Sequence, residues 1–162
     1  MNFLESVKSG FRRYATFSGR STRSEFWWWW LFQVLAQMIL GVVDADLANI
    51  VYVGLFVPTL AVSVRRVHDT NRTGWWVAWP WISLGILIVS GLALLVDLGI
   101  DLATSVAWDS NNSLDGASGF VLLIIGLAAL SLVVAFIVNL IFFLQKSDPN
   151  LNRFGPPPPP KV

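Results

Sequence analysis

The sequence predicts an all-α integral membrane protein with four transmembrane helices, on the strength of its composition and the placement of its charges. Hydrophobic residues make up 55% of the chain and charged residues only 13%. A soluble domain of this length normally contains a larger share of charged residues. The eleven Lys and Arg residues fall within residues 8–23, 65–72 and 146–161, and long apolar runs separate these segments. The other two connections carry Asp but neither Lys nor Arg. Because Lys and Arg in short loops stay on the cytoplasmic side, we expect both termini to be cytoplasmic.

Residues 1–25 are predicted to form a cytoplasmic amphipathic helix followed by a basic motif. Phe3, Val7, Phe11 and Tyr14 recur at intervals of three or four residues, and charged side chains occupy the other directions. This spacing is typical of a helix that lies in the headgroup region of a bilayer. A short helix packed on the protein's own cytoplasmic face is the alternative.

Residues 26–144 are predicted to form the four-helix transmembrane domain. An apolar helix of about 20 residues spans the ~30 Å hydrocarbon core. The sequence offers four such runs, namely Phe26–Val43, Leu47–Val64, Trp75–Val96 and Gly119–Leu144. The first two form a tight hairpin, although a re-entrant pair that never crosses the membrane fits the same charges. Residues 97–118 are expected to be an exposed loop, and residues 145–162 a cytoplasmic proline-rich tail.

Several kinds of chemistry lack their usual residues in this chain. There is no Cys, which excludes disulfides and thiolate metal sites, and a single His is too little for a zinc site. The four apolar runs hold no Asp, Glu, Lys, Arg or His, which argues against a proton relay or an ion pump. We therefore expect no metal, no cofactor and no assignable catalytic residue.

The densest polar segment, residues 65–74, joins the second and third predicted helices. Asp69 follows Arg65 by four residues and Arg66 by three, so on a helix it can pair with either of them. His68 beside Asp69 invites a catalytic interpretation. However, neighbouring side chains on a helix point about 100° apart and are poorly placed to form a relay. A salt-bridged turn at the membrane interface is the preferred interpretation.

A second polar segment, residues 18–27, precedes the first predicted helix. Thr22 and Glu25 have the spacing of a capping box, and Glu25 is also placed to receive an arginine from residues 65–74. Arg20, Arg23 and the three arginines of residues 65–74 would then share one cytoplasmic surface. Such a surface attracts anionic headgroups by about 1 kcal/mol per basic residue near the membrane.

Eight of the nine tryptophans lie near the predicted cytoplasmic ends of the first and third helices. Tryptophan prefers the membrane–water boundary, so anchoring accounts for Trp27, Trp28, Trp75 and Trp76. The run of residues 27–30 covers every direction around a helix, however, and some of its rings must face protein.

Proline interrupts the second and third predicted helices, at Pro58 and Pro80. Bundles tolerate such prolines where neighbouring groups satisfy the carbonyls that they free. Gln33, Gln37 and Asn139 are available as hydrogen-bonding groups between helices.

The motifs resemble, in order, those of the bacterial inner-membrane family called domain of unknown function 805. They are Gly-Arg-Ser-Thr-Arg-Ser-Glu-Phe-Trp at 19–27, Arg-Arg-Val-His-Asp at 65–69, Gly-Trp-Trp at 74–76 and Asn-Arg-Phe-Gly-Pro at 152–156. The resemblance covers nearly the whole chain. It implies a small multi-pass protein of the bacterial inner (plasma) membrane, with the motifs gathered at the cytoplasmic face. It implies no established reaction, substrate or cofactor, and the proline run at 156–160 departs from the family's usual Gly-Pro-Asp-Pro ending.

We therefore expect a non-enzymatic membrane module whose cytoplasmic face binds an anionic lipid headgroup or a partner protein, and no nucleic acid. One alternative is a small-solute transporter or channel built as a homo-oligomer. The other is an enzyme acting on a lipid headgroup, with His68 as its acid–base group. The candidate ligand or interface residues are Arg20, Arg23, Glu25, Arg65, Arg66, His68, Asp69, Arg72, Trp75, Trp76, Asn152 and Arg153.

Overall fold

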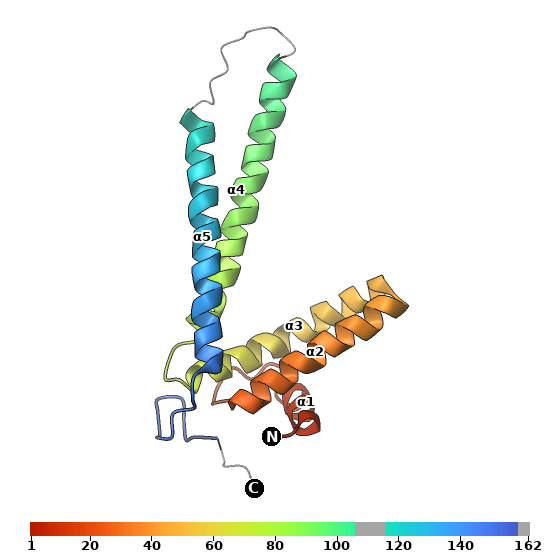
Figure 1. Ribbon diagram of the computed structural model, residues 1–162, viewed down its shortest axis with the longest axis vertical. Coiled ribbons are helices and arrows are strands. Elements are labelled where there is room, and N and C mark those ends of the chain that lie inside the picture. Colours follow the sequence, from red (N-terminus) through yellow and green to blue (C-terminus); the bar gives the residue numbers. More distant parts are fainter. Residues whose placement is uncertain (106–115, 159–162) are drawn as a thin grey trace. The chain divides into compact units, whose positions relative to one another are not determined.

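The computed structural model describes residues 1–105 and 116–158, and the regular elements among them are all helices. They are α1 (Phe3–Arg12), α2 (Arg23–Val43), α3 (Ala45–His68), α4 (Trp75–Ser105) and α5 (Gly116–Leu144), shown in Figure 1. Within this described part, α2 to α5 are each long and apolar enough to cross a membrane. The prediction of an all-helical chain with four long apolar helices is confirmed.

The expected loop at residues 97–118 is wrong at both of its ends. Helix α4 continues to Ser105, and α5 begins at Gly116. The prediction placed helix ends where the hydropathy falls, but Asp97 and Asp101 lower the hydropathy without breaking a helix, and no proline intervenes. The centre of the expected loop lies outside the described residues.

The chain forms two compact units, residues 1–77 with 139–162, and residues 78–138. In the first unit α2 and α3 lie side by side as an antiparallel pair (Figure 1). Asp44 both ends α2 and caps α3, because its carboxylate accepts from the backbone N–H groups of Asp46 (2.8 Å) and Leu47 (3.0 Å). This double use explains the tight predicted hairpin. The core of the unit consists of Phe26, Trp29, Leu55 and Val62.

Helix α1 packs on α2 through its smallest residue. A Cβ atom at Gly10 would lie 2.2 Å from ring atoms of Trp29, so the two helices approach as closely as glycine allows. Phe3 and Phe11 add edge-on contacts with the rings of Trp28 and Trp29. Asn2 and Glu5 form a capping box that fixes where the helix begins.

Both helix-interior prolines have the carbonyl that they free satisfied by a distant side chain. Pro58 in α3 cannot donate to the carbonyl of Gly54, four residues earlier, and the Tyr14 hydroxyl donates to it instead. Pro80 in α4 likewise leaves the carbonyl of Trp76, which accepts from Asn139 Nδ2 at 2.8 Å. The condition under which helix bundles tolerate such prolines is therefore met at both positions.

The second unit is held by a serine between its two helices. Ser131 Oγ of α5 accepts from the indole N–H of Trp79 at 3.0 Å and shares a hydrogen bond with Ser83 Oγ at 2.9 Å. Small hydroxylated residues at such contacts let apolar helices approach each other closely.

Candidate functional site

The motif segments meet at the end of the first unit where α2 begins and α3 ends. The residues brought together there include three buried arginines and two buried carboxylates, which we call the arginine cluster: Arg20, Arg65, Arg66, Glu25 and Asp69. Their side chains are 2% exposed or less where they form ion pairs. A buried charge is stable only when it is paired and hydrogen-bonded, so the contacts of each member decide what the cluster can do.

Asp69 is the centre of the cluster. Its Oδ1 accepts from Nε of Arg20 at 2.9 Å, and its Oδ2 accepts from Nη1 of Arg66, which lies three residues earlier. Of the two helical spacings that the sequence left open, the structure therefore selects Arg66. Arg65 lies on another side of α3, and its ion pair is with Glu25 at 3.6 Å.

Glu25 ties α2 to α1. Its Oε1 accepts from Ser9 Oγ at 2.8 Å and from Arg13 Nη2 at 2.7 Å. Thr22 caps α2 as expected, since Thr22 Oγ1 accepts from the Glu25 N–H at 3.1 Å. The capping box is present only in this half, because the carboxylate is directed to α1 and Arg65. The expectation that Glu25 receives an arginine from residues 65–74 is confirmed.

Arg65 and Arg66 also donate to backbone carbonyls, whereas Nε and Nη2 of Arg65 are buried without a hydrogen-bond acceptor. Arg65 Nη1 donates to the carbonyls of Thr16 (2.6 Å) and Arg13 (3.3 Å), which fixes the segment that follows α1. Arg66 donates to the carbonyls of Phe143 (3.3 Å) and Gln145 at the end of α5. Cations suit this position because the carbonyls at a helix C-terminus carry partial negative charge.

Residues 147–155, which we call the C-terminal strap, close over Arg20 and His68. Arg20 donates to the strap carbonyls of Asp148, Asn150 (2.7 Å) and Gly155 (3.3 Å). The ring of Phe154 stacks on the ring of His68, with centroids 3.8 Å apart and planes at 5°. Asn152 and Arg153 were expected at the site from their motif, but nothing in the sequence predicted this closure.

The two named strap residues bind the loop after α3. Asn152 Nδ2 donates to the carbonyl of His68 at 3.0 Å, and Arg153 Nη2 donates to the carbonyl of Asn71 at 3.1 Å. Asn71 has φ of 60° and Gly155 has φ of 122°, so both loops turn at residues suited to left-handed backbone. In the sequence, Asn71 and Gly155 each lie in a polar segment, and this is the signal from which the two turns could have been predicted.

His68 is placed for packing more than for proton transfer. Its Nδ1 lies 3.3 Å from the carbonyl of Gly19, and the Phe154 ring covers one face. Asp69 is committed to the two arginines, so the His68–Asp69 pair forms no relay. Within the described ranges, no three His, Cys, Asp or Glu residues come together as a metal site.

Three further candidates lie beside the cluster. Arg72 stacks over the ring of Phe142, 4.1 Å from its centroid, and donates to Gln145 Oε1 at 2.8 Å. Trp76 contacts the same ring edge-on, while Trp75 is largely exposed. Arg72 and Trp76 thus hold α5, and Trp75 remains free for an interfacial role.

Of the four consecutive tryptophans at residues 27–30, some pack against the protein and others are exposed on its surface, as expected. Trp29 is buried, and its indole N–H donates to Thr59 Oγ1 at 3.1 Å. Trp28 and Trp30 are exposed, and Trp27 is half-buried against Phe26. The prediction that some of these rings face protein is confirmed.

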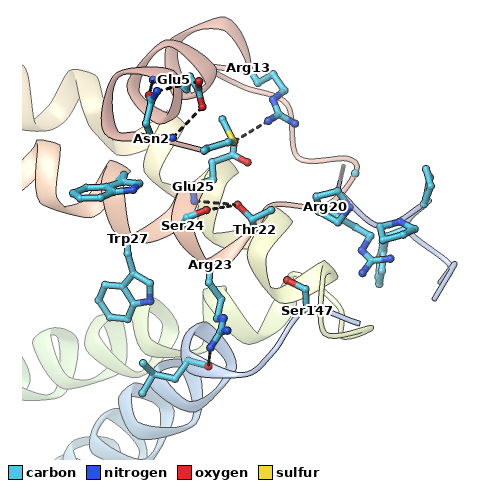
Figure 2. A pocket seen from close by; sticks show the side chains of 18 residues that line it. Asn2, Glu5, Arg13, Arg20, Thr22, Arg23, Ser24, Glu25, Trp27 and Ser147 are labelled. Atoms are coloured by element: carbon cyan, nitrogen blue, oxygen red, sulfur yellow. Dashed lines mark hydrogen bonds and ion pairs between the residues drawn. The ribbon is translucent and has the colours of Figure 1, made fainter. Parts of the chain in front are cut away.

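A pocket of about 1500 Å³ opens beside the cluster (Figure 2). Its lining comes from the start of α1, the first turns of α2 and the strap, and includes Thr22, Arg23, Ser24, Trp27 and Ser147. Arg23 is exposed, and its Nη1 donates to the carbonyl of Leu144 at 3.3 Å. In the described part of the chain, Arg13 and Arg20 on this lining have carboxylate partners, whereas Arg23 has none.

Comparison with known proteins gives one family. The chain is 34% identical to inner membrane protein YhaI of Escherichia coli over 91 residues, which cover 50% of this chain and 77% of YhaI. It is 33% identical to inner membrane protein YhaH of the same organism over 92 residues, 48% of this chain and 76% of YhaH. For the uncharacterized E. coli protein YiiR the identity is 31% over 119 residues, 60% of this chain and 82% of YiiR. No solved structure matches. Residues 14–156 match the family described as "Protein of unknown function (DUF805)", and the chain belongs to that family.

Proposed function

We propose that this chain is a non-enzymatic module of the bacterial inner membrane whose cytoplasmic face binds an anionic lipid headgroup in the pocket around Arg23. The inner-membrane location rests on the relatives YhaI and YhaH, and the cytoplasmic placement on the distribution of Lys and Arg. The observation that carries the proposal is the unbalanced positive charge at this pocket.

The charge balance follows from the ion pairs. Four arginines, Arg13 and those of the cluster, share two carboxylates, Glu25 and Asp69. Arg23 adds a further positive charge on the pocket surface, with a carbonyl and no carboxylate as its described partner. Glu5, also on the lining, is engaged in the α1 capping box. An anionic group at Arg23 would offset this excess.

The pocket also offers the groups that a phospholipid headgroup needs. A guanidinium binds phosphate oxygens through paired N–H donors. The hydroxyls of Thr22 and Ser24 lie 3.1 Å apart beside Arg23, and Trp27 and Trp28 supply apolar rings at the boundary with the hydrocarbon. Arg65 and Arg66 are buried and do not line the pocket, although Arg65 contacts two of its lining residues, through the ion pair with Glu25 and the hydrogen bond to the Arg13 carbonyl.

Helix α1 supplies a second contact with lipid in this proposal. Leu4, Lys8 and Arg12 recur every four residues along one side of the helix, and all three are exposed. Apolar and basic side chains on one face suit the surface of an anionic bilayer. The opposite side of α1, at Gly10, is the one packed on α2.

Native mass spectrometry of the protein released from nanodiscs tests the pocket. The discs contain phosphatidylglycerol and phosphatidylcholine, and wild type is compared with Arg23→Gln. We expect wild type to retain phosphatidylglycerol selectively, and Arg23→Gln to lose about fivefold of that retention, the equivalent of about 1 kcal/mol for one basic residue.

Lys146→Gln is the matched control, because Lys146 is exposed, lies near the same end of α5 and does not line the pocket. Its retention should equal that of wild type. An equal loss of phosphatidylglycerol retention in both variants would show that general surface charge, and not the pocket, causes the retention. Wild-type protein released without any bound lipid would overturn the proposal. A protein recovered in place of lipid would indicate the partner alternative.

A further inference from the structure

We propose that the C-terminal strap is a removable cover whose backbone carbonyls occupy a second phosphate-binding position, on Arg20. This inference rests on the proposed function, because the covered position adjoins the pocket of Arg23. The ligand class is a phosphate group, carried either by a lipid headgroup or by a soluble phosphate. The strap would then regulate how much positive charge the pocket presents.

Arg20 carries a charge that its carboxylate partner shares with another arginine. Asp69 binds both Arg20 and Arg66, and the side chains of all three are 1% exposed or less. Two guanidiniums around one carboxylate leave one positive charge in excess. Since an uncompensated buried charge is costly, the site favours an additional anion over neutral groups.

The groups that now satisfy Arg20 are neutral carbonyls of the strap. Nη1 donates to the carbonyls of Asn150 and Gly155, and Nη2 donates to the carbonyl of Asp148. Three oxygens around one edge of a guanidinium resemble the oxygens of a bound phosphate group. A phosphate group in their place would accept the same hydrogen bonds and would also offset the excess positive charge. The carbonyls that Arg66 binds belong to Phe143 and Gln145 at the end of α5, and they would remain in place.

The strap is held weakly enough to leave. Its apolar contact is the stack of Phe154 on His68, and Leu151 is exposed. The other described contacts are hydrogen bonds: those from Arg20, those of Asn152 and Arg153 to the carbonyls of His68 and Asn71, and that of the Asp148 N–H to the carbonyl of Asp69. Segments with few buried apolar contacts open locally at low free-energy cost.

The strap also forms one wall of the pocket, so its opening would join the two positions. Ser147 and Phe154 of the strap line the pocket together with Arg20 and Arg23. Figure 2 shows Arg20 and Ser147 on the side of the pocket formed by the strap. Displacement of the strap would expose Arg20 to the ligand that Arg23 attracts.

The first test measures the position of the strap in the full chain. Because the chain has no Cys, spin labels at Leu151→Cys and Ala15→Cys, both exposed positions, report one distance. We expect that distance to be unimodal in phosphatidylcholine nanodiscs, and to gain a longer component with phosphatidylglycerol or with inorganic phosphate. A longer component with phosphatidylglycerol alone identifies the lipid headgroup as the source, and one with phosphate identifies a soluble ligand. An unchanged distance in all three conditions overturns the proposal.

The second test loosens the strap without touching the arginines. Phe154→Ala removes the stack on His68, and Leu151→Ala is the control for a strap residue without that contact. We expect Phe154→Ala to increase retention of the phosphate ligand by roughly tenfold, since apparent affinity rises with the open fraction. Unchanged or weaker retention in a folded Phe154→Ala protein would refute the cover. If Phe154→Ala did not increase retention but Arg23→Gln still reduced it, the proposed function would be retained and only the role of the strap as a cover would be rejected.

Discussion

The isosteric change Asp69→Asn tests whether the arginine cluster holds the first unit together. The amide has the shape of the carboxylate but no charge, and it turns an N–H₂ group toward one of two guanidiniums. Asp69 accepts charged hydrogen bonds from Arg20 and Arg66, each worth about 1.5–3 kcal/mol. Removing one partner of a buried ion pair costs about 3–5 kcal/mol in measured cases. We expect Asp69→Asn to lower the free energy of unfolding by about 3–5 kcal/mol.

The assay is titration with sodium dodecyl sulfate in mixed micelles, followed by tryptophan fluorescence. Asp46→Asn is the matched control, because Asp46 is exposed and its change should stay within about 0.5 kcal/mol. The double variant Arg66→Gln/Asp69→Asn should cost less than the sum of the two single variants, since both lose the same contact. An Asp69→Asn protein as stable as the control, or strict additivity, would refute the structural role assigned to the cluster.

Three further predictions concern packing, the proline in α3 and topology. Gly10→Ala would place a methyl group 2.2 Å from an indole ring and should destabilise the packing of α1 by about 1–3 kcal/mol, seen as faster proteolysis of the N-terminus. Gly41→Ala, with nothing within 4 Å of the added atom, should behave as wild type, and equal proteolysis of both would contradict the close approach. Tyr14→Phe should cost about 1–3 kcal/mol in the same micelle titration, because a carbonyl of α3 loses its donor; an unchanged titration would show that the contact is dispensable. A single Cys at Lys146 should react with an impermeant maleimide only in inverted vesicles, and one at Asp46 only in intact spheroplasts; reaction of both from one side would favour the re-entrant hairpin.

Membrane-spanning elements were predictable because their signal is local and one-dimensional. Each of the four predicted apolar runs lies within one of the helices α2 to α5. Hydropathy indicates which residues can lie within a membrane, but it does not determine where a helix ends. For this reason α4 extends beyond its predicted end at Val96, to Ser105. The hairpin was predictable for the same local reason, because only Asp44-Ala45-Asp46 separates the first two apolar runs.

The cluster was predictable in its members but not in its pairing. Spacing along α3 restricted Asp69 to Arg65 or Arg66, and nothing in the sequence distinguishes them. The second partner, Arg20, comes from a separate segment, and only tertiary structure brings it to Asp69. The closure of the strap over Arg20 was missed because Arg20 binds backbone carbonyls there, and every sequence contains these.

The expected role of the motif arginines as one ligand-binding surface is refined by where they lie. Arg65 and Arg66 are fully buried and bonded to carbonyls, while Arg23 is exposed at the pocket. Charge composition cannot separate these cases, because an arginine that fastens two segments and an arginine that awaits a ligand are the same residue. Their ligand role stays a prediction, and Arg23 is the position at which to test it.

The two proline contacts also imply an order of assembly during synthesis. Tyr14, which completes α3 at the carbonyl of Gly54, has already been translated when α3 emerges from the ribosome. Asn139, which completes α4 at the carbonyl of Trp76, is made 63 residues later. The contact of Tyr14 with α3 can therefore form as soon as the α2–α3 hairpin has been made, whereas the contact of Asn139 with α4 must wait until most of α5 has been made.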